Sequence, residues 1–288
     1  MDGFIFVNKP AGPSSFAVVK RIRKFCGGGR IGHAGTLDPY AGGLLIVATG
    51  KATRLIEYVP LEPKQYSFSL KFGYETDTLD EEGNVLRDGG RIPALEEIES
   101  VLPQFVGKIM QEPPRFSAIK INGRRAYKLA RKNEEFFIKP RAISIHSLST
   151  DGFDTASGIV NLTVECSAGT YVRSLAQDIA RAAGTLGHAS RILRTATGPF
   201  TLDNAIDYNA INDSLEKLLV PIKTVLGESR CVGVTLQQRE KILHGEDVLM
   251  YVADEEEPRF FAFDDKDELV AVLIKKNKNL FHPAKVFD

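Results

Sequence analysis

The segment His33-Ala34-Gly35-Thr36-Leu37-Asp38-Pro39 places a single carboxylate in a turn between two apolar stretches of the chain. Glycine allows the backbone to turn sharply at position 35, and Pro39 keeps the residue before it away from helical dihedrals. The side chain of Asp38 is therefore expected to project from a loop. An ordinary Asx turn would contain the same residues, so the rest of the chain has to decide between a structural and a chemical role.

Short apolar elements surround this turn. Residues 4–7 and 44–48 read as buried strands, and Ser14-Ser15 can cap a helix over residues 16–25 that ends at Gly27-Gly28-Gly29. A half-buried strand is expected at residues 64–72, where apolar and polar residues alternate: the apolar ones are Tyr66, Phe68, Leu70 and Phe72. Such alternation is typical of a strand with one buried face.

The second half of the chain continues this mixture of strands and single helices. Pro93 begins a helix over residues 92–102, and residues 158–166 alternate again. A further helix is expected to be capped by Thr170, to end at Gly184, and to bury Leu175, Ile179 and Ala182. The spacing lacks a regular βαβ repeat, so we expect the α+β class, with a mixed, largely antiparallel sheet and flanking helices.

A break is expected at residues 227–229, after a helical stretch over residues 214–226. Beyond it, a helix over residues 236–244 and several short strands, among them 248–252, 260–263 and 269–274, predict a small β-rich domain. The chain therefore divides into a larger domain, 1–228, and a C-terminal domain, 229–288.

Composition narrows the class of protein. With 288 residues, 43% of them hydrophobic, the chain can bury a sizeable core. Its apolar runs are too short for a membrane span, and the N-terminus lacks a signal pattern, so a cytoplasmic protein is expected. A monomer is expected as well. Three cysteines and five histidines are scattered, which predicts neither a disulfide framework nor a metal site.

The charges are unevenly distributed, although the formal net charge is zero. Residues 115–141 contain nine basic and two acidic residues, whereas residues 254–268 contain eight acidic residues and two basic ones. The basic stretch fits a phosphate-contacting surface, but a solvated loop would have the same composition.

Four segments, in this order, resemble the TruB family of bacterial tRNA pseudouridine synthases. They are Asn8-Lys9-Pro10-Ala11-Gly12 with Ser14-Ser15, the turn from His33 to Pro39, the stretch from Pro113 through Lys120 and Gly123 to Arg131, and Gly169-Thr170-Tyr171-Val172-Arg173-Ser174-Leu175. The resemblance covers residues 3 to about 200. Pro13 departs from it, since the family often has a bulky residue there. The resemblance implies the pseudouridine synthase fold and the isomerisation of uridine 55 in the T-loop of tRNA, without a cofactor.

The residue chemistry agrees with such an isomerisation. Cleavage of a glycosidic bond builds positive charge on the sugar, which a carboxylate can stabilise, attack or relieve by taking a proton. Glycoside hydrolases usually need two carboxylates, whereas an isomerase has to keep water away from the intermediate. The chemical segments contain one compelling carboxylate, Asp38, beside apolar Leu37, Pro39 and Tyr40.

By position in these segments, Asp38 matches the catalytic aspartate of the family, and Arg173 is its expected partner, holding the carboxylate by two parallel hydrogen bonds. Tyr66 matches a tyrosine that stacks on the uracil, although it also fits a core position of its strand. His33, Tyr171 and Leu193 match residues that contact a flipped-out nucleotide. The expected contacts with the RNA backbone are Lys9, Arg115, Lys120, Arg124, Arg125, Lys128 and Arg131.

The same resemblance assigns two RNA-binding parts. The insertion at residues 121–141 matches a thumb that folds over the RNA, where Gly123 would provide mobility and the cations would bind phosphates. The C-terminal domain matches the RNA-binding PUA module by position only. Two alternatives remain: a related synthase that modifies another RNA or works in a guided ribonucleoprotein, against which the thumb argues, and a non-catalytic RNA-binding or tRNA-folding protein. A nucleoside hydrolase is more distant, because it needs a second carboxylate or metal ligands.

Overall fold

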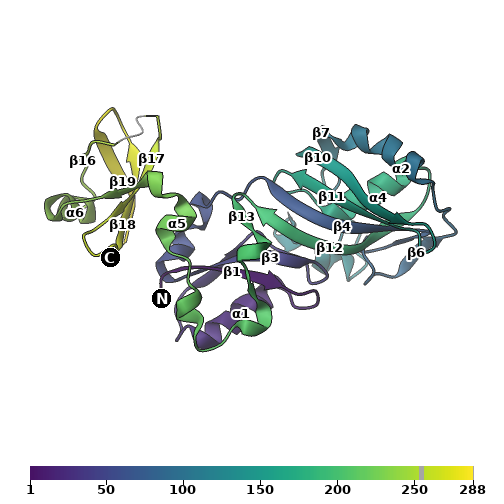
Figure 1. Cartoon of the computed structure of the whole chain (residues 1–288), viewed down its shortest axis with the longest axis horizontal. Helices are drawn as coiled ribbons and strands as arrows, with labels where there is room; N and C mark the ends of the chain where they lie inside the picture. The colour runs from purple at the N-terminus through teal and green to yellow at the C-terminus, as the bar shows by residue number, and fades with distance from the viewer. Residues whose placement is uncertain (253–255, 288) are drawn as a thin grey trace.

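The computed structural model in Figure 1 describes residues 1–252 and 256–287, and these contain a ten-stranded mixed sheet, a five-stranded sheet and two short hairpins. The strands of the large sheet are β1 (Gly3–Lys9), β2 (Ile31–Ala34), β3 (Gly42–Thr49), β4 (Lys64–Phe72), β7 (Gly107–Gln111), β10 (Arg141–Asp154), β11 (Ile159–Cys166), β12 (Gly187–Thr197), β13 (Phe200–Thr201) and β14 (Ile206–Asp207).

The order of the large sheet is β14-β1-β3-β12-β4-β11-β10-β7, with β2 beside β3 and β13 beside β12. The pairs β1–β14 and β12–β3 are parallel, and the other described pairs of this sheet are antiparallel. The expected α+β class with a largely antiparallel sheet is therefore confirmed. Strand β4 has the bounds that its alternation predicts, and Tyr66, Phe68, Leu70 and Phe72 enter one core cluster.

The helices are α1 (Ser15–Phe25), α2 (Leu95–Val101), α3 (Ala126–Ala130), α4 (Val172–Ala182), α5 (Ile222–Leu226) and α6 (Leu236–Leu243). Short 3-10 helices cover Gly50–Tyr58, Leu102–Phe105, Leu202–Asn204, Tyr208–Ala210, Leu215–Leu218 and Glu228–Arg230. Helix α1 has the expected cap, because the Ser14 hydroxyl accepts a hydrogen bond from the amide of Ala17 at 3.1 Å. Helix α4 packs against β12 and β4, and α2 packs on α4.

Three details of the helices differ from expectation. The N-cap of α4 is Tyr171, because the hydroxyl of Thr170 donates to the carbonyl of Ser167 instead of capping the helix. Ala182 is exposed, and the buried stripe of α4 runs through Leu175, Ala176 and Ile179. Helix α2 is also shorter than the predicted range 92–102, since its N-cap is Ala94 and the chain continues beyond Val101 as a 3-10 turn.

The C-terminal sheet has the order β15-β17-β18-β19-β16. Its strands are β15 (Cys231–Gly233), β16 (Val248–Leu249), β17 (Arg259–Phe263), β18 (Leu269–Lys275) and β19 (Leu280–Val286), and α6 packs on β18 and β19. The chain turns into this sheet at Gly227, whose φ is 89°. Asp254 and Glu255, which begin the acidic run, lie outside the described residues.

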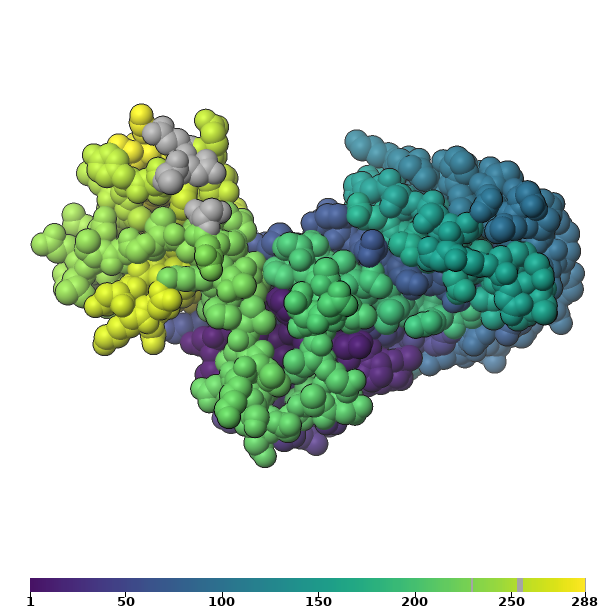
Figure 2. All heavy atoms as spheres, viewed as in Figure 1, coloured from purple at the N-terminus to yellow at the C-terminus, as the bar shows by residue number. Residues whose placement is uncertain are grey.

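The two sheets share an apolar cluster. Phe4 and Ile46 from the large sheet belong to it together with Phe261 and Phe263 from β17. On the face shown in Figure 2, the outline is hollowed between the C-terminal sheet, at the yellow end of the colour scale, and the β7–β10 end of the large sheet. A division at residues 228/229 remains a prediction, because the shared cluster joins the two parts.

Two hairpins extend from the large sheet. They pair β5 (Tyr74–Thr76) with β6 (Val85–Asp88), and β8 (Lys120–Ile121) with β9 (Arg124–Arg125). The second hairpin turns through Asn122 and Gly123, with φ values of 48° and 80°, a geometry that favours asparagine and glycine. Gly123 therefore serves the turn of this hairpin. Among the described residues, no helix combines the length and the apolar character that a membrane span requires.

Candidate active site

The Asp38 loop is fixed from both sides by the N-terminal segment. Buried Ser15, in the first turn of α1, donates to the carbonyl of Leu37 at 2.8 Å and accepts from the amide of Leu37 at 2.9 Å. On the other side of the aspartate, the Gly12 amide donates to the carbonyl of Pro39 at 2.8 Å. These backbone contacts hold the residues before and after Asp38, so the carboxylate projects from an ordered turn.

Lys9 takes part in the same arrangement, and this corrects its expected role as an RNA contact. Its side chain is fully buried, and Nζ donates to the carbonyls of Pro10, Pro13 and Pro39 at 2.8, 2.8 and 3.2 Å. Burial lowers the pKa of Lys9 to about 8, while the Asp38 carboxylate acts in the opposite direction. Lys9 thus holds the loop from inside and has no surface to offer to RNA.

Asp38 and Arg173 meet as the family resemblance implies, although they are 135 positions apart in the chain. Nη2 of Arg173 donates to Oδ2 of Asp38 at 2.6 Å. The guanidinium side chain is 4% exposed and the carboxylate side chain 39%, so a buried cation holds a carboxylate that stays open to a ligand. Among the described residues, the expected second parallel hydrogen bond is absent and none donates to Oδ1 of Asp38.

The rest of the Arg173 guanidinium is occupied by a residue that sequence reasoning missed. Nη1 lies 3.3 Å from a carboxylate oxygen of Asp80, whose side chain is 6% exposed, and donates to the carbonyl of Thr78 at 2.7 Å. Nη2 also donates to the carbonyl of Phe116 at 3.1 Å. Arg173 therefore connects Asp38 to a second, buried carboxylate and to the chain that leads into the thumb.

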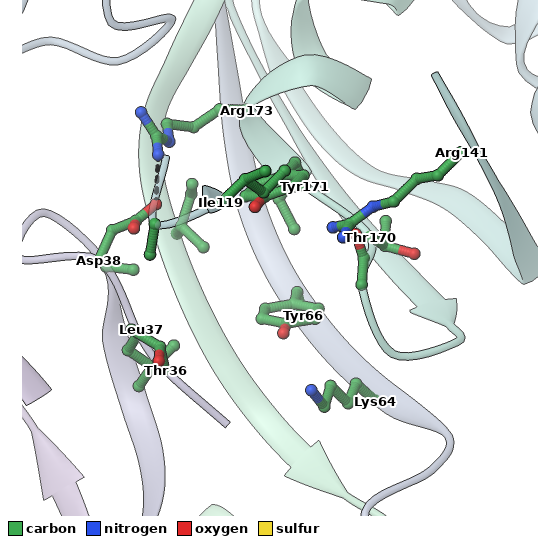
Figure 3. A pocket seen from close by; sticks show the side chains of 15 residues that line it. Thr36, Leu37, Asp38, Lys64, Tyr66, Ile119, Arg141, Thr170, Tyr171 and Arg173 are labelled. Atoms are coloured by element: carbon green, nitrogen blue, oxygen red, sulfur yellow. Dashed lines mark hydrogen bonds and ion pairs between the residues drawn. The ribbon is translucent and has the colours of Figure 1, made fainter. Parts of the chain in front are cut away.

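A pocket of about 340 Å³ opens beside Asp38 (Figure 3). Tyr66, Tyr171 and Arg173 line it together with Asp38, so four of the predicted site residues meet in one place. Two further cations, Lys64 and Arg141, also line it. The described residues contain no group of three His, Cys, Asp or Glu side chains arranged to hold a metal ion, and all three cysteines are free.

Tyr66 combines a core position with a place in the lining of the pocket. It belongs to the core cluster, with 7% of the residue exposed, and it also lines the pocket. Burial raises the pKa of Tyr66, while the guanidinium of Arg194, opposite Tyr66 in the β12–β4 register, acts against this shift. The aromatic ring can therefore present one face or edge to a ligand while the core holds it in place.

Tyr171 is held by its backbone. The side chain of buried Gln111 accepts a hydrogen bond from the Tyr171 amide at 2.8 Å and donates to its carbonyl at 3.1 Å. The guanidinium of Arg141 lies 4.6 Å from the centre of the Tyr171 ring and donates to the carbonyl of Gly169. Sequence reasoning gave neither Gln111 nor Arg141 a place in the site.

At one predicted pocket position, the structure places the neighbouring residue in the pocket: Ile192 instead of Leu193. Ile192 lines the pocket, and it shares a face of the sheet with Phe68, its partner across β12–β4. Leu193 points to the other face, so its assignment to the pocket was wrong. His33, on β2, is half-buried with an unpartnered Nδ1, and it is not among the residues that line the pocket.

A second pocket of about 330 Å³ lies on the other side of the ion pair. Asp38 and Arg173 line both pockets, and the second is completed by Asp80 and by the thumb residues Tyr127 and Arg131. The Asp38–Arg173 ion pair therefore lies between the 340 Å³ pocket beside the sheet and the 330 Å³ pocket beside the thumb.

The other six basic residues predicted to contact RNA lie in the thumb or just before it, and we call them the thumb cations. They are all exposed, but they differ in their partners. Arg124 forms two hydrogen bonds with the Glu134 carboxylate at 2.7 and 2.9 Å, and Arg125 donates to the carbonyl of Ala118. The side chains of Lys120 and Lys128 make no hydrogen bond or ion pair with the described residues. The remaining two, Arg115 and Arg131, lie against the rings of Phe136 and Tyr127.

Comparison with known proteins points to one family. The sequence model of a family described as TruB family pseudouridylate synthase (N terminal domain) matches residues 23–172. The protein named tRNA pseudouridine synthase B of Rickettsia bellii is 37% identical over 286 residues, which cover 98% of this chain and 97% of the relative. The protein of the same name from Dehalococcoides mccartyi is 34% identical and covers 100% of this chain and 97% of the relative.

The fold has a solved counterpart as well. A chain in the crystal structure of a Cbf5–Nop10–Gar1 complex superposes with a TM-score of 0.70 and 26% sequence identity. The match covers 99% of this chain and 85% of the other.

Proposed function

Because the chain belongs to the TruB family of pseudouridylate synthases, we propose that it converts uridine 55 in the T-loop of tRNA to pseudouridine, with Asp38 as the catalytic carboxylate. The relatives named tRNA pseudouridine synthase B support tRNA as the substrate. The observation that carries the proposal is the Nη2–Oδ2 contact of 2.6 Å between Arg173 and Asp38 at the edge of the 340 Å³ pocket.

The lining of the pocket supports isomerisation over hydrolysis. Of the described residues that line it, Asp38 alone carries a carboxylate, so no second carboxylate is at hand to activate water. Leu37, Ile119, Val172 and Ile192 give the pocket apolar walls. A bound base would displace water from these walls and protect the intermediate from hydrolysis.

In this proposal the target uridine leaves the stacked T-loop and enters the pocket, where its sugar meets Asp38 and its base meets the ring of Tyr66. Tyr171 and Ile192 would confine the base, and Arg173 would hold Asp38 throughout the reaction. Extraction of a base costs a few kcal/mol, which contacts between the phosphates and the thumb cations would offset. Lys120 and Lys128, as unpaired exposed cations, are suited to this task.

The proposed reaction requires no cofactor, since the product is an isomer of the substrate. We further propose that the chain acts alone, as a cytoplasmic monomer. A guided ribonucleoprotein, as suggested by the Cbf5–Nop10–Gar1 complex, would instead need other proteins or a guide RNA. The exposed basic hairpin of β8 and β9, next to the pocket, favours direct binding of tRNA.

The test is to incubate the purified chain with an unmodified tRNA transcript and to map pseudouridine along it. We expect modification at uridine 55 without added protein or RNA. The Asp38→Asn variant should lose activity, whereas Asp203→Asn, a change at an exposed aspartate, should keep it. Product at other positions would contradict the target assignment, and full activity of Asp38→Asn would contradict the mechanism. Binding of tRNA without any product would favour the non-catalytic alternative.

A further inference from the structure

Lys64 places an ammonium group in the pocket, on the opposite side of the Tyr66 ring from the Asp38–Arg173 pair (Figure 3). It begins β4, and because Tyr66 follows two positions later, both side chains extend from the same face of the strand. The side chain is half-buried, and its Nζ makes no hydrogen bond or ion pair with the described residues. A partly buried ammonium without a counter-ion is costly, so this group calls for a partner.

A second unpaired donor lies next to it. Arg194 is 1% exposed, and two of its nitrogens donate to the carbonyls of Leu44 and Gly35, but Nη1 is buried without a partner. A Cβ atom on Gly35 would lie 3.3 Å from this Nη1 and 3.4 Å from Nζ of Lys64, so both cations meet over the glycine of the catalytic loop. Burial lowers the pKa of Lys64, and Arg194 adds to that shift.

The pocket thus has two electrostatic ends. The Asp38 end presents an open carboxylate, suited to the positive charge that develops on a sugar. The Lys64 end presents two cations that form no ion pair with the described residues, although the carboxylate of Glu62 is near enough to oppose the lowering of the Lys64 pKa. An unpaired donor aimed into a pocket is most useful where negative charge develops during the reaction.

We propose that Lys64 binds a carbonyl oxygen of the target uracil and stabilises the negative charge that the base acquires when its bond to the ribose breaks. This role rests on the proposed function, and it makes Lys64 a catalytic residue at the base, complementary to Asp38 at the sugar. Arg194 is a positioning residue, because it holds Gly35 and adds positive potential behind Lys64.

The electron balance shows why a cation is needed there. When the C1′–N1 bond breaks, its electron pair stays on N1 and spreads to the two carbonyl oxygens. If Asp38 attacks C1′, it supplies the pair that the sugar has lost. After the base turns, C5 gives a pair to C1′, Asp38 leaves with its own pair, and C5 loses a proton while N1 gains one. If Asp38 instead adds to the base or removes a sugar proton, the uracil still gains negative charge.

The test compares Lys64→Met with Lys71→Met, a lysine at the other end of β4 that is paired with Glu81 and does not line the pocket. We expect kcat of the Lys64→Met variant to fall about 100-fold on a tRNA transcript, as for loss of one preorganised donor, with KM within about threefold of wild type. Lys64→Arg should recover part of the loss. A raised KM with unchanged kcat would overturn the proposal and indicate a phosphate contact.

A transcript with 5-fluorouridine at the target separates catalysis from structure. Fluorine withdraws electrons and stabilises the released base, so loss of 5-fluorouridine should depend on Lys64 less than loss of uridine does. An equal defect on both transcripts would indicate a structural role and overturn the proposal. If melting curves show that Lys64→Met unfolds, Lys64→Gln replaces it in both comparisons, because glutamine also removes the charge but keeps a polar end.

The failures of the two proposals can be told apart. If neither wild type nor Lys71→Met forms pseudouridine, the proposed function is wrong. If both form it and the Lys64 variants form it equally fast, only the role of Lys64 is wrong.

Discussion

Arg173 donates one hydrogen bond to Asp38, from Nη2 to Oδ2 at 2.6 Å, and turns its other terminal nitrogen toward Asp80 at 3.3 Å. A bidentate pair would have occupied both oxygens of Asp38. The shared arrangement leaves Oδ1 without a protein partner among the described residues, so this oxygen is available to the sugar or base. The buried Asp80 compensates the part of the arginine charge that Asp38 does not.

Replacement of Arg173 by lysine should therefore be far from conservative. A single ammonium cannot span Asp38, Asp80 and the two carbonyls that the planar guanidinium joins. We expect Arg173→Lys to reduce single-turnover formation of pseudouridine by about 100-fold or more. Arg181→Lys, on the same helix, is the matched control and should be close to wild type, because Arg181 is half-exposed and its partner, the buried Glu75, is also paired with Arg87. Similar rates for the two variants would show that Asp38 does not need the guanidinium.

Loss of the buried carboxylate should affect stability as well as activity. Asp80→Ala leaves the buried Arg173 with Asp38 as its one carboxylate partner among the described residues, so part of its charge is uncompensated and up to about 3–5 kcal/mol of unfolding free energy is expected to be lost. It also removes the acceptor of hydrogen bonds from Thr78 and from the Glu82 amide. Urea unfolding measures this loss, and Glu81→Gln, at a half-exposed neighbour, should change stability by no more than about 0.5 kcal/mol. A stable Asp80→Ala protein would mean that Asp38 alone neutralises Arg173.

Local patterns predicted the elements that bury one face. The alternation of residues 64–72 gave β4 its bounds, and Ser14 before an apolar period gave the start of α1. Both signals depend on neighbouring residues only, so no tertiary information was needed. The meeting of Asp38 and Arg173 came instead from the family resemblance, since no local pattern relates two residues 135 positions apart.

The residues that the sequence did not place correctly are positioned by contacts between distant parts of the chain or by the path of a loop. Asp80 stands in an acidic stretch that reads as a solvated loop, yet it is buried, because its backbone bridges to Ala189 of β12 and its side chain meets Arg173 of α4. Which of the neighbours Ile192 and Leu193 faces the pocket depends on the register of β12 against β4, and the residues of β12 alone do not reveal this register. Lys9 looked like a surface cation, yet three carbonyls of its own loop surround its ammonium group.

Lys9 should give the stability of the fold a measurable pH dependence. Its pKa is about 8 in the folded protein against 10.5 for an ordinary lysine, so between these values the unfolded chain binds more protons. The contribution of Lys9 to the free energy of unfolding therefore rises with pH across this window, and it is lost as the pH drops to about 8. We expect the difference in unfolding free energy between wild type and Lys9→Met to grow in favour of wild type by about 2 kcal/mol from pH 7.5 to 9.5.

Other groups that titrate in this range are common to both proteins and cancel in the difference. Lys20→Met, at an exposed position of α1, should show no such change with pH. A constant difference between wild type and Lys9→Met would mean that Lys9 keeps an ordinary pKa inside the loop.

The thumb lysines should govern the salt dependence of tRNA binding. Lys120 and Lys128 are exposed and unpaired with the described residues, whereas the charge of Arg124 is already compensated by Glu134. Each lysine that contacts a phosphate releases about one counter-ion on binding, so the Lys120→Gln/Lys128→Gln variant should flatten the slope of log K against log salt by about 2. Fluorescence titrations of tRNA at several salt concentrations measure this slope.

The matched control is Lys217→Gln/Lys266→Gln, which removes the same charge from exposed positions far from the thumb in sequence. It should leave the slope nearly unchanged. Equal slopes for the two double variants would show that net charge, and not contact of the thumb with phosphates, sets the affinity for tRNA. Because Glu134 already screens Arg124, an Arg124→Gln variant should change the slope less than either thumb lysine does.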